Sequence, residues 1–122
     1  MKNEKFSVRL GTLHELFVFN DWARDAVMRC AAGLSKEQLD RSFEMGLGSL
    51  RNTFNHLYAV ESVWLERWHG RPPQYRISAE GVEMTPLWDE FRDVAKRRDA
   101  YLAGLKDAEL RVDLTYKNLK GE

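Results

Sequence analysis

The stretch Ser49-Leu-Arg-Asn-Thr-Phe-Asn-His-Leu-Tyr-Ala-Val-Glu-Ser-Val-Trp-Leu-Glu-Arg-Trp68 carries the strongest helix pattern in this chain. A serine suited to N-capping opens it, and a glycine suited to the end of a helix follows soon after it. At about 100° per residue, Val63 and Val60 lie about 20° and 40° on either side of His56. We therefore expect His56 to face the buried side of the helix, where both nitrogens of an imidazole need partners.

Two other long segments also have helical spacing. The first runs from about Thr12, a candidate cap, to Ala32, and the other is expected to start at Thr85-Pro86, where a cap precedes proline. The inner stripe expected for the first helix is Leu13, Leu16, Phe17, Asn20, Ala23, Val27 and Cys30. Three long amphipathic helices in one short chain predict an all-α, up-and-down helix bundle.

The connections between these helices carry their own signals. Ser35 and Gln38 predict a capping box that opens one short turn of helix. Residues 71–84 form a loop long enough to cover a site. Near the end of the chain, Val112-Asp-Leu-Thr-Tyr116 alternates like a short strand and is followed by residues with turn character.

Length and composition describe one domain of 122 residues with no charge bias. Lysine plus arginine and aspartate plus glutamate both total 19, and no basic stripe favours nucleic-acid binding. Cys30 is the single cysteine and cannot form an intrachain disulfide, and Met1–Phe6 lacks the apolar run of a signal peptide. No stretch approaches the length of a membrane span, so we expect a cytoplasmic protein.

His56 has two interpretations. A lone histidine on an apolar face is more often a hydrogen-bonded core residue than a metal ligand. A zinc-type site needs three or four ligands at about 2.0–2.3 Å, and the other candidates are His14, His69 and Cys30. We expect His14 to face water, His69 to favour the C-terminal helix dipole and Cys30 to fill the core. No HExxH, CxxC or phosphate-binding loop accompanies His56, so the residues alone leave both interpretations open.

Three charged side chains near these helices are expected at the surface. Glu61 falls about 140° around its helix from His56, which places it at the rim or in solvent. Arg98 and Asp99 are adjacent in sequence and are expected to be solvated or to lie at the edge of the bundle. No general base can be named among them.

Three segments, in order along the chain, carry a more specific pattern. They are Phe19-Asn-Asp-Trp-Ala23, then Gly48-Ser-Leu-Arg-Asn-Thr-Phe-Asn-His-Leu-Tyr-Ala-Val-Glu-Ser-Val-Trp-Leu65, then Tyr116-Lys-Asn-Leu-Lys-Gly-Glu122. Together they resemble the DinB-like (DinB/YfiT) superfamily, and the resemblance covers nearly all of residues 1–122 as a single domain. Its most specific part is the Gly-Ser entry into a helix that bears histidine, then glutamate and tryptophan.

The resemblance implies a four-helix bundle in which three histidines hold a divalent metal, zinc or nickel, at one end. It places the first ligand at His56, and the other two form an H-x3-H pair on a last helix that follows the Tyr-x-Asn-x-x-Gly turn. Here that turn reaches Glu122, so we expect three long helices, one ligand of three, and the fourth helix beyond Glu122. Two histidines from beyond residue 122 or from another chain would then be needed. Asn20 matches a further family position and is expected to point inward, organising the bundle or the pocket rim.

Two functions follow from this resemblance. The first is a damage-inducible-type, metal-dependent thiol transferase or hydrolase that acts on a small molecule, together with a low-molecular-weight thiol in the transfer reaction. The second is a non-catalytic helical module for the stress response or for protein interaction. The resemblance also implies a homodimer, and neither a membrane nor a nucleic acid is expected as a partner.

Overall fold

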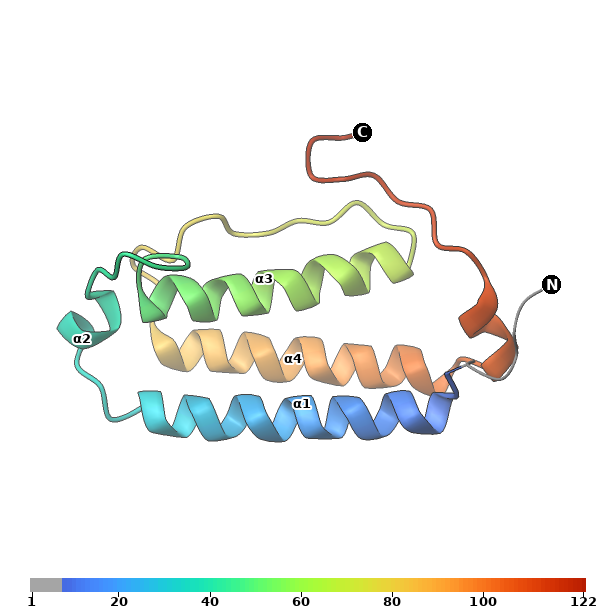
Figure 1. The fold of residues 1–122 in the computed structure, drawn as a ribbon, viewed down its shortest axis with the longest axis horizontal. Helices are drawn as coiled ribbons and strands as arrows, with labels where there is room; N and C mark the ends of the chain where they lie inside the picture. The colour runs from blue at the N-terminus through green and yellow to red at the C-terminus, as the bar shows by residue number, and fades with distance from the viewer. Residues whose placement is uncertain (1–7) are drawn as a thin grey trace.

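The computed structural model describes residues 8–122, and it folds them into three long helices and two short ones (Figure 1). The elements are α1 (Leu10–Ala31), α2 (Lys36–Asp40), α3 (Leu50–Trp68), α4 (Met84–Ala103) and the 3₁₀ helix η2 (Asp107–Arg111). The predicted all-α bundle is therefore confirmed. Met1–Phe6, on which the absence of a signal peptide was argued, lies outside the described residues. No helix within residues 8–122 is long and apolar enough to cross a membrane.

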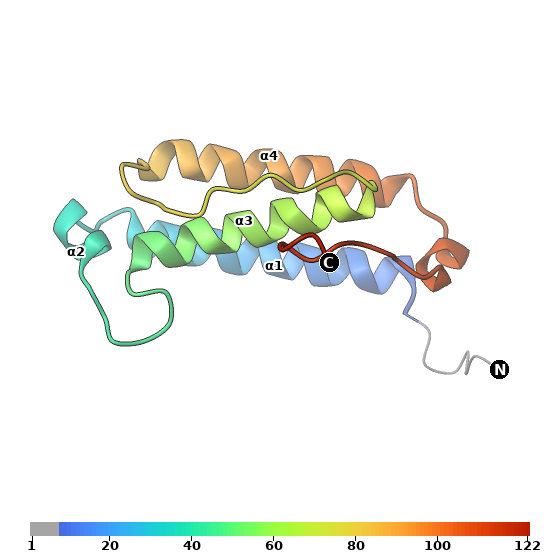
Figure 2. The ribbon, with the colours of Figure 1, turned by 90° about the horizontal axis from the view of Figure 1, so that it is seen from above.

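The long helices do not simply alternate in direction. In Figures 1 and 2, α3 and α4 run the same way and α1 runs against both. Residues 69–83 make this possible, because they return along α3 before α4 begins. Arg51, in the first turn of α3, donates a hydrogen bond to the carbonyl oxygen of Val82 at the end of this connection. The up-and-down order thus holds between α1 and α3, whereas α3 and α4 lie parallel.

Local sequence signals set several helix ends as predicted. The Ser49 hydroxyl accepts a hydrogen bond from the N–H of Asn52 at 3.1 Å, which caps α3. Ser35 and Gln38 form the expected capping box at the start of α2. Gly70 has φ of 70°, a left-handed conformation that glycine adopts at low cost, and it closes α3 after Trp68.

Two helix starts differ from the prediction. Thr12 lies inside α1, which begins at Leu10, and the Leu10 N–H donates to Asp107 Oδ1 at 2.9 Å. This distant carboxylate satisfies one of the free N–H groups at the start of α1 in place of a local cap. Helix α4 begins at Met84 rather than after Thr85, with no side-chain cap.

The predicted strand over residues 112–116 is wrong. No strand occurs within residues 8–122, and this segment is exposed and irregular. An alternating segment becomes a strand only when a partner satisfies its backbone hydrogen bonds, and no second strand lies beside this one.

The apolar core lies where α2 closes one end of the long helices. Its buried members are Met28, Ala31, Leu39, Phe54, Leu87 and Phe91. Tyr58 packs edge-on against Phe91, with ring centroids 5.7 Å apart. These residues come from all four α-helices, so burial of their apolar surface joins the helices into one unit.

A buried ion pair joins α1 to α4. Arg98 is 4% exposed, and its two terminal nitrogens donate to the two carboxylate oxygens of Asp21. The Arg98 guanidinium also lies 4.4 Å from the ring centre of Phe17, and Asp21 accepts a further hydrogen bond from Arg24. The prediction that Arg98 is solvated is therefore wrong, whereas Asp99 is exposed as expected. Arg98 is buried because α4 turns this side chain toward a carboxylate on α1.

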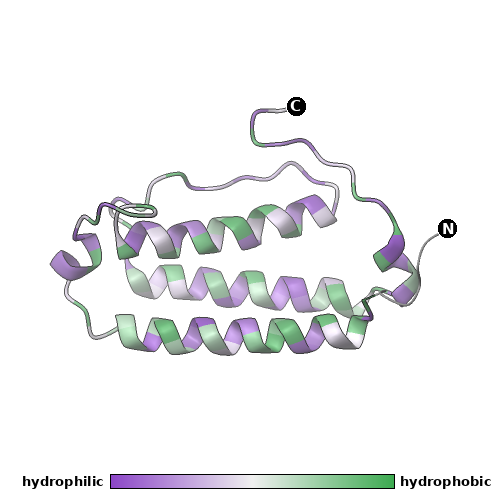
Figure 3. Cartoon of the chain, viewed as in Figure 1, coloured by the Kyte–Doolittle hydropathy of each residue, from purple (hydrophilic) through white to green (hydrophobic). Residues whose placement is uncertain are grey.

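Part of the predicted inner stripe of α1 faces outward. Leu16 and Val27 are 58% and 53% exposed, and Cys30, expected in the core, is also exposed. On α3, Leu57 and Val60 are 48% and 39% exposed. The hydropathy colouring of Figure 3 shows apolar residues recurring along the long helices. We call Leu16, Val27, Leu57 and Val60 the open face, because no other element of residues 8–122 covers them.

Candidate functional site

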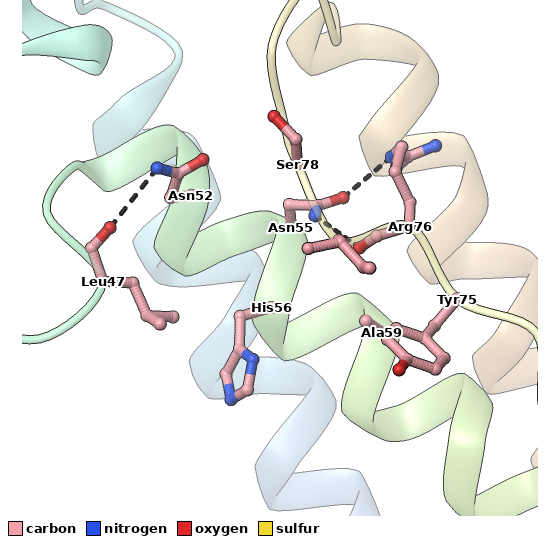
Figure 4. A pocket seen from close by; sticks show the side chains of 9 residues that line it. Leu47, Asn52, Asn55, His56, Ala59, Tyr75, Arg76 and Ser78 are labelled. Carbon is pink, nitrogen blue, oxygen red and sulfur yellow. Dashed lines mark hydrogen bonds between the residues drawn. The ribbon is translucent and has the colours of Figure 1, made fainter. Parts of the chain in front are cut away.

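His56 lies on the exposed side of α3, so the prediction that it is buried is wrong. Of its two valine neighbours, Val63 is 6% exposed but Val60 is 39% exposed. Apolar neighbours on one helix therefore did not decide burial here, because no other element covers His56. Figure 4 shows the imidazole pointing away from the neighbouring polar side chains, and within residues 8–122 it has no hydrogen-bond partner.

A pocket of about 500 Å³ opens beside His56. It lies between the first half of α3 and the returning connection (Figure 4), and its lining includes Asn52, Asn55, Ala59, Tyr75, Arg76 and Ser78. This volume is within the range of small-molecule sites. The prediction that residues 71–84 form a loop that could cover a site is consistent with this placement of Tyr75, Arg76 and Ser78.

A polar clamp fixes one wall of the pocket. Asn55, 2% exposed, donates from Nδ2 to the carbonyl oxygen of Arg76 at 3.0 Å and accepts from Arg76 Nε at 2.9 Å. The two terminal nitrogens of Arg76 bind the carboxylate of Glu90 on α4 at 3.0 and 2.7 Å. The hydrogen bond to Glu90 is the main cause that raises the pKa of Arg76 above its usual value. The clamp therefore joins α3, the connection and α4 through a guanidinium that stays charged.

This chain matches the DinB family over residues 1–122. It belongs to the DinB family. Among curated proteins, a formamidopyrimidine-DNA glycosylase of Nocardioides sp. (strain ATCC BAA-499 / JS614) is 29% identical to it over 96 residues. That alignment covers 79% of this chain and 28% of the glycosylase, so the chain spans little more than a quarter of this relative. No solved structure gives a significant match.

The other metal-ligand candidates of this DinB-family chain lie apart from His56. His69 is exposed at the far end of α3, with its ring 4.8 Å from that of Tyr101. His14 is exposed on α1, as predicted, and Cys30 is exposed near the end of the same helix. Within residues 8–122, no three side chains of histidine, cysteine, aspartate or glutamate come together in a way that could hold a metal. The residues described therefore do not make up a metal site by themselves.

A polar pair links α1 and α3 within the open face. Asn20 donates from Nδ2 to Glu61 Oε1 at 3.2 Å, and the other oxygen, Oε2, is buried without a hydrogen-bond partner among the described residues. Glu61 is half-buried, which is consistent with the rim position expected for it, whereas Asn20 is exposed and not turned inward as expected. Asn20 still joins two helices, because its amide reaches across to α3.

The sequence pattern did not reveal the clamp. Asn55 stands next to His56, and its neighbours suggested only a polar position on a helix. Arg76 lies in a connection without periodicity, so no spacing rule could place it opposite Asn55. The segment 71–90 is no richer in charged residues than the rest of the chain, so composition gave no signal for this contact either.

Proposed function

We propose that this protein is a metal-dependent DinB-family enzyme, a thiol transferase or hydrolase for a small molecule, in which His56 supplies one of the metal ligands. The observation that carries the proposal is the placement of His56: an exposed imidazole without a partner in residues 8–122, beside a pocket of about 500 Å³. An imidazole that donates to no neighbour keeps both nitrogens available for coordination.

The remaining ligands must come from outside the described residues, because His56 stands alone among the donors seen there. Two sources are open to the protein: polypeptide that follows residue 122, or a second copy of the chain. In either case the added element would approach over the open face, since His56 and Val60 lie one helical turn apart. A bound divalent metal would supply Lewis acidity and lower the pKa of a bound water or thiol.

Metal content measures the role of His56 directly. The protein would be purified without a metal-binding tag, exposed to zinc or nickel, freed of excess metal and analysed by mass spectrometry. We expect bound metal in the wild type, loss of most of it in His56→Ala, and no loss in the control His14→Ala, whose imidazole is also exposed. Equal metal in all three proteins would remove His56 from the set of ligands.

The catalytic part of the proposal needs a second readout. Consumption of a low-molecular-weight thiol would be followed with an electrophilic acceptor, before and after removal of metal. We expect turnover in the metal-loaded wild type and its loss in His56→Ala. A His56→Ala protein that turns over as fast as the wild type would refute metal-dependent transfer through this residue.

The second candidate function is a non-catalytic interaction module, and the open face favours it. Contiguous exposed apolar surface often marks a site of contact with another protein. The expected occupant is a second copy of the chain. Sedimentation would show a dimer in the wild type and a monomer after Val60→Glu. Metal content unchanged by His56→Ala, combined with such a dimer, would favour this function over the enzyme.

The activity named for the curated relative is not part of either proposal. The alignment leaves out most of that glycosylase, and the present chain has a formal net charge of zero, whereas DNA-binding proteins are usually basic.

A further inference from the structure

Arg67, near the end of α3, is a buried cation that has no carboxylate partner in the part of the chain that the structure describes. Three arginines are buried among the described residues: Arg51 at 8%, Arg67 at 9% and Arg98 at 4% exposure. Arg51 pairs with Asp40, and Arg98 pairs with Asp21. Arg67 forms no ion pair within residues 8–122. Burial of a charged group is costly unless an opposite charge or hydrogen bonds compensate for it.

Two aromatic rings, which also contact each other, lie against this guanidinium. Its Cζ lies 4.7 Å from the ring centre of Trp64 and 4.4 Å from that of Tyr116. The two rings meet edge-on, with centroids 5.1 Å apart. Such contacts hold an arginine in a fixed orientation and recover part of the cost of its desolvation. They leave the hydrogen-bonding edge of the guanidinium to find partners of its own.

That edge has few hydrogen-bond acceptors among the described residues. Arg67 Nη2 donates to the carbonyl oxygen of Lys117 at 3.4 Å, which is a long hydrogen bond to a neutral acceptor. Nε is buried and has no partner within the described residues. A guanidinium with five donors normally binds carboxylates or several carbonyl groups when it is buried. Arg67 therefore has the donors for an anion that the described residues do not provide.

A cavity of about 850 Å³ lies beside Arg67. Arg67 contributes to its lining together with the apolar or aromatic side chains of Pro72, Pro73, Tyr75, Tyr116 and Leu119. The exposed surface of its wall is mostly apolar, as in small-molecule sites, and it also carries the charged side chains of Arg71, Lys117 and Glu122.

Among the described residues that line the cavity, Arg67 is the only buried cation. Arg71 donates two hydrogen bonds to Glu66, at 2.7 and 3.0 Å. Glu122 accepts a hydrogen bond from the Asn118 amide at 3.1 Å, so its carboxylate is engaged within the turn. Lys117 lines the cavity as well and is exposed, which adds a second, solvated positive charge.

We propose that this cavity binds a small organic carboxylate, whose oxygens pair with Arg67 and whose apolar body lies against Pro72, Tyr75 and Leu119. A carboxylate is favoured over a phosphate because only one cation is buried here, which matches a single negative charge. The carboxylate contact at Arg67 lies at the opposite end of α3 from His56, although Tyr75 lines both pockets. Helix geometry separates Arg67 from His56 by about 16 Å.

The probe is benzoate, which combines one carboxylate with an apolar ring, and benzyl alcohol is its neutral counterpart. Binding would be followed by nuclear magnetic resonance through the indole N–H signal of Trp64. In the wild type we expect saturable shifts with benzoate and much weaker binding of benzyl alcohol. Inorganic phosphate is a third ligand, and tighter binding of phosphate than of benzoate would overturn the carboxylate assignment.

Variants of Arg67 test the contact itself. Arg67→Met keeps an unbranched stem against the rings but removes the charge, and we expect benzoate to bind about tenfold more weakly or worse. Arg67→Lys keeps the charge without the planar fork and should bind with intermediate affinity, which preserves the test if the methionine variant does not fold. The control is Arg92→Met, because Arg92 also lies over a tryptophan, 5.3 Å from the ring of Trp88, but outside the cavity. The proposal fails if benzoate gives no saturable shift in the wild type, or if both folded Arg67 variants bind it as tightly as Arg92→Met.

Discussion

Removal of the negative charge of Asp21 should destabilise the protein more than removal of the positive charge of its buried partner, Arg98. Asp21→Asn keeps the shape of the side chain but leaves two cations, Arg24 and Arg98, without their shared carboxylate. Their side chains are 11% and 5% exposed. Breaking a fully buried pair in this way costs about 3–5 kcal/mol. Asp21 is 25% exposed, and Asp99 still contacts Arg98 at 3.0 Å, so we expect a smaller loss of about 2 kcal/mol.

Arg98→Met should cost about 1 kcal/mol or less, since it leaves no unpaired buried cation and its stem can remain against Phe17. Asp21 would then keep its hydrogen bond from Arg24 at 3.2 Å and its partial access to water. The double variant Asp21→Asn/Arg98→Met should be more stable than Asp21→Asn alone, because only Arg24 then lacks Asp21, and Arg24 keeps its contact with Asp25 at 3.0 Å.

The assay is urea unfolding followed by far-ultraviolet circular dichroism. The matched control is the exposed pair Asp89 and Arg92, at 3.4 Å with side chains 68% and 63% exposed, where either change should alter the unfolding free energy by about 0.5 kcal/mol or less. The reasoning is refuted if Arg98→Met lowers the unfolding free energy more than Asp21→Asn does. An uncompensated buried positive charge would then not be the main cause of the destabilisation.

Three further predictions concern the clamp, the acid response and the core. Asn55→Ala removes both hydrogen bonds to Arg76, so we expect the unfolding free energy to fall by about 1–2 kcal/mol. Amide hydrogen exchange in residues 71–83 should become faster, and unchanged exchange would contradict the clamp. The hydrogen bond from Arg71 lowers the pKa of Glu66 below its usual 4.5, so this contribution to stability is complete above pH 4.5 and is lost as the pH falls through the lowered value. Unfolding midpoints should therefore fall less steeply below pH 4.5 in Arg71→Met than in the wild type, and identical acid profiles would argue against the pair. Phe91→Ala, at a site 1% exposed, should cost about 3–5 kcal/mol in thermal unfolding, and a cost near zero would place Phe91 outside the core.

The helices could be predicted where their signals are local. Ser35 and Ser49 cap helices through N–H groups a few residues away, so a short window of sequence contains the whole cause. The start of α1 could not be found in this way. Its capping group is Asp107, 97 residues from Leu10, and a window around Thr12 offered only a weaker alternative.

Burial was harder to predict than helicity, because an apolar stripe does not specify its partner. The stripe of α1 holds Phe17, which contacts Trp68 with ring centroids 6.2 Å apart, and also Leu16, which is 58% exposed. Which half is covered depends on the direction in which the next helices run. The parallel order of α3 and α4 follows from the path of residues 69–83, and no periodicity encodes that path.

For the candidate site, the sequence pattern could single out His56 but not its surroundings. The family pattern concerns residues on helices, where spacing has a fixed geometric meaning. The pocket wall comes from Tyr75 and Arg76, whose positions depend on tertiary hydrogen bonds to α3 and α4. The burial of Arg67 could not be predicted for a related reason, since its aromatic partner Tyr116 lies in an irregular segment and is distant in sequence.

The hydrogen bond between Leu10 and Asp107 affects how the protein folds during translation. The ribosome makes α1 first, yet α1 packs against α4, and the carboxylate that completes its first turn is made 97 residues later. During translation α1 must wait with its apolar side unpaired while α2 and α3 emerge. Among the helices of residues 8–122, α1 is therefore synthesised first and its first turn is completed last, and its apolar side is open to aggregation and to chaperones during that interval.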